Sequence, residues 1–118
     1  MRILIVDDDR GIVGALRNIL EFEGIEVAAV NDGLAGLEYL HVQPLPDLVL
    51  LDLFMPCLSG REFLERLADQ ARFRNLPVVI MTAASGGDLM PPPGSYLAIL
   101  RKPFDLDELM EVVDRARR

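Results

Sequence analysis

The chain has 118 residues, a length that accommodates one compact domain and leaves no room for a second. Its hydrophobic share of 51% and charged share of 26% are those of an ordinary folded protein, which excludes disordered and collagen-like classes. A formal net charge of −7 disfavours binding to nucleic acid or to an anionic membrane, and no apolar run approaches the roughly 18 residues that span a bilayer. With the single cysteine Cys57 and no signal-peptide pattern, these features predict a cytoplasmic protein.

Short apolar runs without alternation predict buried strands separated by helices. In chain order, strands are expected at 3–6, 27–30, 48–51 and 78–81, with a weaker fifth strand at 96–100. Apolar residues recur at helical spacing within 12–20, 34–40, 63–67 and 106–113. This alternation is typical of an α/β fold, here a single-domain, doubly wound parallel sheet of five strands with helices on both faces.

One segment breaks the alternation between the fourth and fifth strands. It contains three consecutive prolines, Pro91, Pro92 and Pro93. A proline inside a helix costs about 3 kcal/mol and pushes the preceding residue out of helical geometry. The fourth helix is therefore expected to be shortened or disrupted.

Polar side chains follow the carboxyl ends of four strands, where open parallel sheets hold their ligands. In chain order these are Asp7, Asp8, Asp9, Asp52, Thr82, Arg101 and Lys102, the last being the only lysine in the chain. If the strand ends converge, three carboxylates share a small space, and two like charges about 4 Å apart repel by roughly 4 kcal/mol at an effective dielectric constant near 20. The cluster then needs a cation, and oxygen ligands without histidine or cysteine favour Mg²⁺. Carboxylate, magnesium, hydroxyl and ammonium together are the groups needed for phosphoryl transfer onto an aspartate.

Each of these residues also has a plainer interpretation. Asp9 is expected to cap the helix that begins near Arg10, and Lys102 taken alone would be a solvated lysine. His41 is interpreted as a surface group at a helix end, and Cys57 as a turn residue. The combination at the strand ends favours the functional interpretation.

Four motifs occur in the order and at about the spacing of a known family. They are Ile3-Leu4-Ile5-Val6-Asp7-Asp8-Asp9, Asp52-Leu53-Phe54-Met55-Pro56 with Gly60 four residues on, Met81-Thr82-Ala83, and Lys102-Pro103-Phe104. With these motifs the sequence resembles a response-regulator receiver domain over essentially the whole chain, 1–118. The resemblance implies a flavodoxin-like sheet with strand order 2-1-3-4-5.

The resemblance also implies a role for each motif residue. Asp52 would accept a phosphoryl group from a phosphohistidine on a sensor histidine kinase or a histidine phosphotransfer protein. Mg²⁺ would be held by Asp7, Asp8, Asp52 and the main-chain carbonyl of Phe54. The phosphoryl oxygens would be contacted by Thr82 and Lys102, and Pro103 would follow a cis peptide bond. The domain would catalyse only its own phosphorylation and dephosphorylation, and would signal by a conformational shift to an unknown protein partner.

The sequence departs from the family pattern in the region that relays the signal. The family's aromatic residue three positions before the lysine is Ile99 here, while Tyr96 lies six positions before it. Phe54 and Ala84 occupy the two positions that flank the phosphoryl group in the family. Because apolar groups there cannot orient an attacking water, the sequence predicts a long-lived aspartyl phosphate.

Alternatives remain open at this stage. A haloacid-dehalogenase-like phosphohydrolase would use Asp7 and Asp9, although Asp9 precedes Arg10-Gly11 rather than Gly-Thr and no cap domain is expected. A degenerate receiver could act as a phosphorylation-independent binding module, which Ile99 and the three prolines favour and the acidic residues do not. A flavin-binding domain lacks the expected phosphate loop after the first strand. No effector sequence follows, so either a stand-alone regulator or a receiver cut from a longer chain is expected.

Overall fold

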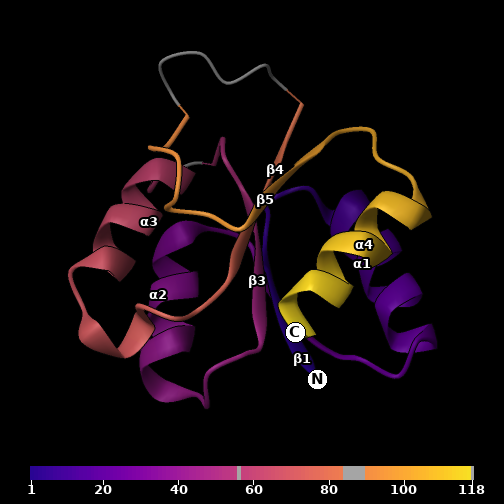
Figure 1. Ribbon diagram of the computed structural model, residues 1–118, viewed down its shortest axis with the longest axis horizontal. Helices are drawn as coiled ribbons and strands as arrows, with labels where there is room; N and C mark the ends of the chain where they lie inside the picture. Colours follow the sequence, from indigo (N-terminus) through magenta and orange to yellow (C-terminus); the bar gives the residue numbers. More distant parts are fainter. Residues whose placement is uncertain (56, 84–89, 118) are drawn as a thin grey trace.

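The computed structural model describes residues 1–55, 57–83 and 90–117 (Figure 1). Its centre is one parallel sheet with strands β1 (Arg2–Val6), β2 (Glu26–Val30), β3 (Leu48–Asp52), β4 (Val78–Thr82) and β5 (Ala98–Arg101). The strands lie in the order β2-β1-β3-β4-β5, and every neighbouring pair is parallel. The predicted flavodoxin-like fold is confirmed.

Helices cover both faces of this sheet. They are α1 (Arg10–Phe22), α2 (Gly33–Val42), α3 (Gly60–Ala68), the 3₁₀ helix η1 (Ala71–Phe73) and α4 (Leu106–Arg117). Figure 1 shows α1 and α4 on one side of the sheet and α2 and α3 on the other. Side chains of β1 and β3 alternate between two separate hydrophobic clusters, one under each helix layer. Burial on both faces explains why the strand sequences are continuous apolar runs.

Helix caps place three helix N-termini at the carboxyl edge of the sheet. The Asp9 carboxylate accepts the N–H groups of Gly11 and Ile12 at the start of α1, so the predicted cap is confirmed. Asp32 caps α2 by accepting the N–H of Ala35. At α3, Ser59 forms a reciprocal capping box with Glu62.

The connection between β4 and β5 contains no helix in its described part, which consists of residue 83 and residues 90–97. There, the Ser95 N–H donates to the Pro92 carbonyl at 3.2 Å, and Gly94 has a φ of +92°. Pro93 and Gly94 thus occupy the central positions of a tight turn, because a positive φ is easily adopted only by glycine. The prediction of a disrupted fourth helix is consistent with this turn, although residues 84–89 lie outside the described part.

The fifth strand is shorter than predicted. It begins at Ala98 rather than at Tyr96, because the chain is still bending as it leaves the turn at Gly94. Tyr96 and Ile99 both pack, partly buried, against the cluster beneath α2 and α3. No helix within the described residues is both long and apolar enough to cross a membrane.

Candidate functional site

Three carboxylates meet where β1 and β3 end. Asp7 directly follows β1 and Asp52 is the last residue of β3, the strand next to β1 in the sheet. Asp7, Asp8 and Asp52 each offer an oxygen, and these oxygens all lie within 4.8 Å of one another. Asp7 and Asp52 are only 1% and 7% exposed, whereas Asp8 is exposed. The cluster is therefore anchored in the core and open to solvent on one side.

Lys102 faces this cluster. Its Nζ lies 2.9 Å from Asp7 Oδ2 and 3.7 Å from Asp52 Oδ1. The Lys102 N–H donates to the Thr82 carbonyl at 2.8 Å, which ties the chain leaving β5 to the end of β4. The peptide bond between Lys102 and Pro103 is cis, as the resemblance implied. One ammonium thus balances part of the charge of three carboxylates.

Thr82 and Phe54 flank the cluster. Thr82 ends β4, beside β3 in the sheet, and is 1% exposed. The Phe54 N–H donates to Asp52 Oδ1 at 3.4 Å, while its side chain is 42% exposed. The six residues for which the resemblance implies a metal or phosphoryl contact therefore lie at one edge of the sheet. Ala84, the other predicted flanking residue, lies outside the described residues.

The carboxyl group of Asp52 is electrostatically unusual. Burial raises its pKa above the ordinary value of 3.8, and the neighbouring charge of Asp7 raises it further. The Lys102 ammonium and the Phe54 N–H oppose this shift, and Asp8 adds a smaller increase. In the absence of a cation, ionising Asp52 thus costs the folded chain free energy.

This cost predicts that Asp52→Asn is more stable to unfolding than wild type at neutral pH when divalent cations are removed. Because the folded pKa of Asp52 is raised, the folded state holds its proton to higher pH than the unfolded chain does. Wild type should therefore lose stability relative to the variant as pH rises from about 3.8 through the raised pKa, and the difference should then stay constant. Urea unfolding in EDTA, from about pH 4 to about pH 8, measures this difference.

The matched control for that measurement is Glu111→Gln, which removes one exposed negative charge from α4. It should change the free energy of unfolding by less than about 0.5 kcal/mol. Adding Mg²⁺ should raise the stability of wild type more than that of Asp52→Asn, since a ligand stabilises the state that binds it. A variant no more stable than wild type in EDTA would show that the carboxylates do not repel one another.

Gly60 is a further residue that shapes the site, and the sequence marked it only as part of a motif. Its N–H donates to the Leu53 carbonyl at 2.9 Å, at the start of α3. A Cβ at this position would lie 2.8 Å from the Leu53 Cα and 2.9 Å from the Asp52 carbonyl oxygen. Only glycine lets α3 approach the end of β3 so closely.

Asp9, His41 and Cys57 lie outside the acidic cluster. Asp9 caps α1, and its N–H donates to Asp7 Oδ1 at 2.9 Å. His41, in the last turn of α2, contacts the Leu37 carbonyl and packs edge-on against the Phe73 ring. Cys57 is exposed with a φ of +70°, a backbone geometry found mainly in turns.

The acidic cluster lies at the carboxyl edge of a sheet with strand order 2-1-3-4-5, and a lysine precedes a cis proline beside it. This arrangement is the one that the resemblance to receiver domains of two-component signalling implied. The response regulator receiver domain family matches residues 3–114. The chain belongs to this family, whose members are signalling modules that take phosphoryl groups from histidine kinases or phosphotransfer proteins.

Individual relatives agree with this assignment. The response regulator Rre1 of Synechocystis is 37% identical over 114 residues, which are 94% of this chain and 49% of that protein. Sporulation initiation phosphotransferase F of Bacillus subtilis is 35% identical over 116 residues, covering 97% of this chain and 91% of that protein. The response regulator TrrA of Thermotoga maritima, solved in complex with Mg²⁺ and BeF, has a TM-score of 0.85 at 30% identity, covering 98% and 97% of the two chains. The chain spans about half the length of Rre1 and of the MprA response regulators it also matches.

Proposed function

We propose that Asp52 is the phosphoacceptor of a two-component phosphorelay, taking its phosphoryl group from a phosphohistidine on a sensor histidine kinase or a histidine phosphotransfer protein. The observation that carries this proposal is the meeting of three carboxylate oxygens within 4.8 Å, with the Lys102 ammonium beside Asp7 and Asp52. Such a concentration of negative charge has no structural benefit by itself, since like charges repel. It becomes useful when a cation and a phosphoryl group enter.

The donor set fits Mg²⁺. Asp7, Asp8 and Asp52 supply carboxylate oxygens, and the main-chain carbonyl of Phe54 is the further proposed ligand. The open side at Asp8 leaves room for water and phosphoryl oxygens, which Mg²⁺ retains among its ligands. A Mg²⁺ held by these residues would supply positive charge to neutralise and orient the phosphoryl oxygens. The Mg²⁺ and BeF in TrrA support this assignment by analogy.

Asp52, Lys102 and Thr82 each have a separate role in the proposed phosphoryl transfer. A carboxylate oxygen of Asp52 bonds to phosphorus as the phosphorus–nitrogen bond of the phosphohistidine breaks, and the electron pair of that bond returns to the imidazole. The Lys102 ammonium, 3.7 Å from Asp52 Oδ1, is placed to pair with a phosphoryl oxygen. The hydroxyl of Thr82, a buried residue, would donate a hydrogen bond to a second phosphoryl oxygen.

We further propose that residues 1–118 form the receiver domain and that phosphorylation shifts its conformation toward a state that binds a downstream protein. The net charge of −7 argues against direct contact with nucleic acid or an anionic membrane. Ile99 replaces the usual aromatic residue on β5, and the Pro-Gly turn replaces helix in the described part of the β4–β5 connection. These two features support, as a second candidate, a receiver that binds its partner whether or not it is phosphorylated.

The exposed Phe54 side chain predicts a slow loss of the phosphoryl group. With an apolar side chain two residues beyond Asp52, nothing at this position orients a water for attack on phosphorus. Wild type should therefore hold its phosphoryl group for minutes or longer, and Phe54→Asn should shorten that lifetime about tenfold. The measurement is intact mass at intervals after the phosphodonor is removed. Phe54→Leu, which stays apolar, is the control, and loss within seconds in wild type contradicts the prediction.

Chemical-shift mapping with Mg²⁺ and beryllofluoride tests the proposed site. In wild type, the amide signals of residues around Asp52, Thr82 and Lys102 should shift. In Asp52→Asn, the signals around position 52 should no longer shift. Asp9→Asn should respond like wild type, because asparagine also caps helices. A response that depends on Asp9 rather than on Asp52 would favour the phosphohydrolase. No response in wild type would favour the phosphorylation-independent binding module.

A further inference from the structure

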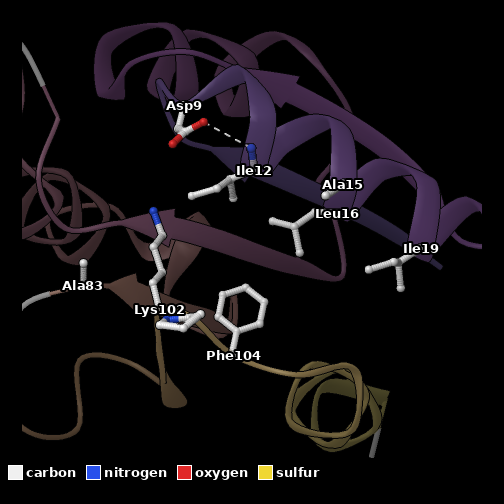
Figure 2. A pocket seen from close by; sticks show the side chains of 9 residues that line it. Asp9, Ile12, Ala15, Leu16, Ile19, Ala83, Lys102 and Phe104 are labelled. Atoms are coloured by element: carbon white, nitrogen blue, oxygen red, sulfur yellow. Dashed lines mark hydrogen bonds between the residues drawn. The ribbon is translucent and has the colours of Figure 1, made fainter.

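An apolar groove runs between α1 and the segment that joins β5 to α4 (Figure 2). Its volume is about 560 Å³, within the range of about 300–1,000 Å³ found for small-molecule sites. Figure 2 shows Ile12, Leu16 and Ile19 projecting from α1 toward Phe104, which forms the opposite wall. The groove therefore has the size and the apolar lining of a ligand pocket.

Among the residues that the structure describes, the charged groups that line this groove, Asp9 and Lys102, lie at one end of it. The Lys102 ammonium pairs with Asp7 and approaches Asp52, two carboxylates that do not line the groove. Asp9 accepts two backbone N–H groups through Oδ1 and has no ion-pair partner among the residues that the structure describes. The charge that remains uncompensated at this end of the groove is thus negative.

We propose that the groove binds a small cationic amphiphile, a primary amine carried on an apolar chain or ring. Its ammonium would pair with the Asp9 carboxylate, and its apolar body would lie between α1 and Phe104. Ile12 and Ile19 are seven residues apart on α1, about 10 Å at a rise of about 1.5 Å per residue, which matches an extended chain of about eight carbons. The groove adjoins the acidic cluster through Lys102, but the proposed binding does not require Asp52 to be the phosphoacceptor.

Three probes with the same eight-carbon chain and different head groups test the proposal: octylamine, octanol and octanoate, each below its micellar concentration. Binding to the full chain is followed by chemical-shift titration. Octylamine should bind saturably and shift the signals of Ile12, Ile19 and Phe104. Octanol should bind about tenfold more weakly and octanoate more weakly still, because only the amine forms a charge-assisted contact with Asp9.

Two variants and a control locate the site. Asp9→Asn keeps a capping side chain but removes the negative charge. It should therefore weaken the binding of octylamine about tenfold and leave the binding of octanol unchanged. Ala15→Leu places a larger side chain in the groove from an exposed helix position, and should weaken all three probes. Asn18→Leu adds the same side chain on α1 outside the groove, and should change none of them.

The outcomes separate cleanly. Octanoate binding as tightly as octylamine, or Ala15→Leu binding octylamine like wild type, would overturn the proposal. If none of the three probes binds saturably, the proposal is also overturned, and a protein partner becomes the better candidate occupant of the groove. Asp52→Asn, which lacks the proposed phosphoacceptor, should still bind octylamine, so this proposal and the proposed function can fail independently.

Discussion

Replacing Lys102 with methionine is expected to slow phosphorylation of Asp52 by at least about 100-fold. The Nζ of Lys102 is the one cationic atom placed within 4 Å of both Asp7 and Asp52 among the described residues, at 2.9 Å and 3.7 Å. Removing a positioned donor that stabilises developing charge typically costs about 10²–10³ in rate. Methionine keeps a similar length and apolar stem, so packing is largely retained. The rate of phosphoryl incorporation from acetyl phosphate with Mg²⁺, followed by intact mass, measures the effect.

Two checks make the Lys102 result interpretable. Magnesium binding by calorimetry should persist in the methionine variant, since the three carboxylates remain. Lys102→Arg restores the charge with a different geometry, and should recover part of the lost rate. A methionine variant phosphorylated within threefold of the wild-type rate would show that Lys102 only balances charge in the resting state.

Gly60→Ala is expected to destabilise the fold by about 1–3 kcal/mol and also to slow phosphorylation. The added Cβ would lie 2.8 Å from the Leu53 Cα and 2.9 Å from the Asp52 carbonyl oxygen, both closer than a Cβ approaches other atoms in folded proteins. Neither contact can be relieved by turning a side chain, so α3 or the end of β3 must move. Because Asp52 is the last residue of β3, that movement displaces the proposed acceptor. Urea unfolding and the phosphorylation rate measure the two effects.

Gly14→Ala is the matched control. Gly14 lies within α1, and a Cβ there would meet nothing within 4 Å. Because alanine is favoured over glycine inside helices, this variant should be more stable than wild type by up to about 1 kcal/mol. If Gly60→Ala is as stable and as rapidly phosphorylated as Gly14→Ala, then the close approach of α3 does not position Asp52.

The first four strands were the most predictable part of the fold. Apolar runs located β1, β2, β3 and β4 to within one residue, and in β1, β3 and β4 burial on both faces leaves little choice of residue type. The fifth strand was predicted too long. Tyr96 is as good a strand former as its neighbours, but the preceding turn at Gly94 delays pairing until Ala98.

The candidate site was predictable in membership but not in geometry. The positions of Asp7, Asp52 and Lys102 at the ends of predicted strands indicate that they belong to one site, because parallel strands bring their carboxyl ends to one edge of the sheet. It does not show that Lys102 lies closer to Asp7 than to Asp52 in the resting chain, because that depends on the path of the chain between β5 and α4. The requirement for glycine at position 60 and the groove along α1 also depend on packing between distant segments.

The most direct test of the phosphoacceptor proposal is the mass of the full chain after incubation with acetyl phosphate and Mg²⁺, followed by mapping of the modified residue. Wild type should gain the mass of one phosphoryl group at Asp52, only when Mg²⁺ is present, and Asp52→Asn should gain none. An unmodified wild-type chain, or a phosphoryl group found on another residue, would contradict the assignment of Asp52 as the acceptor.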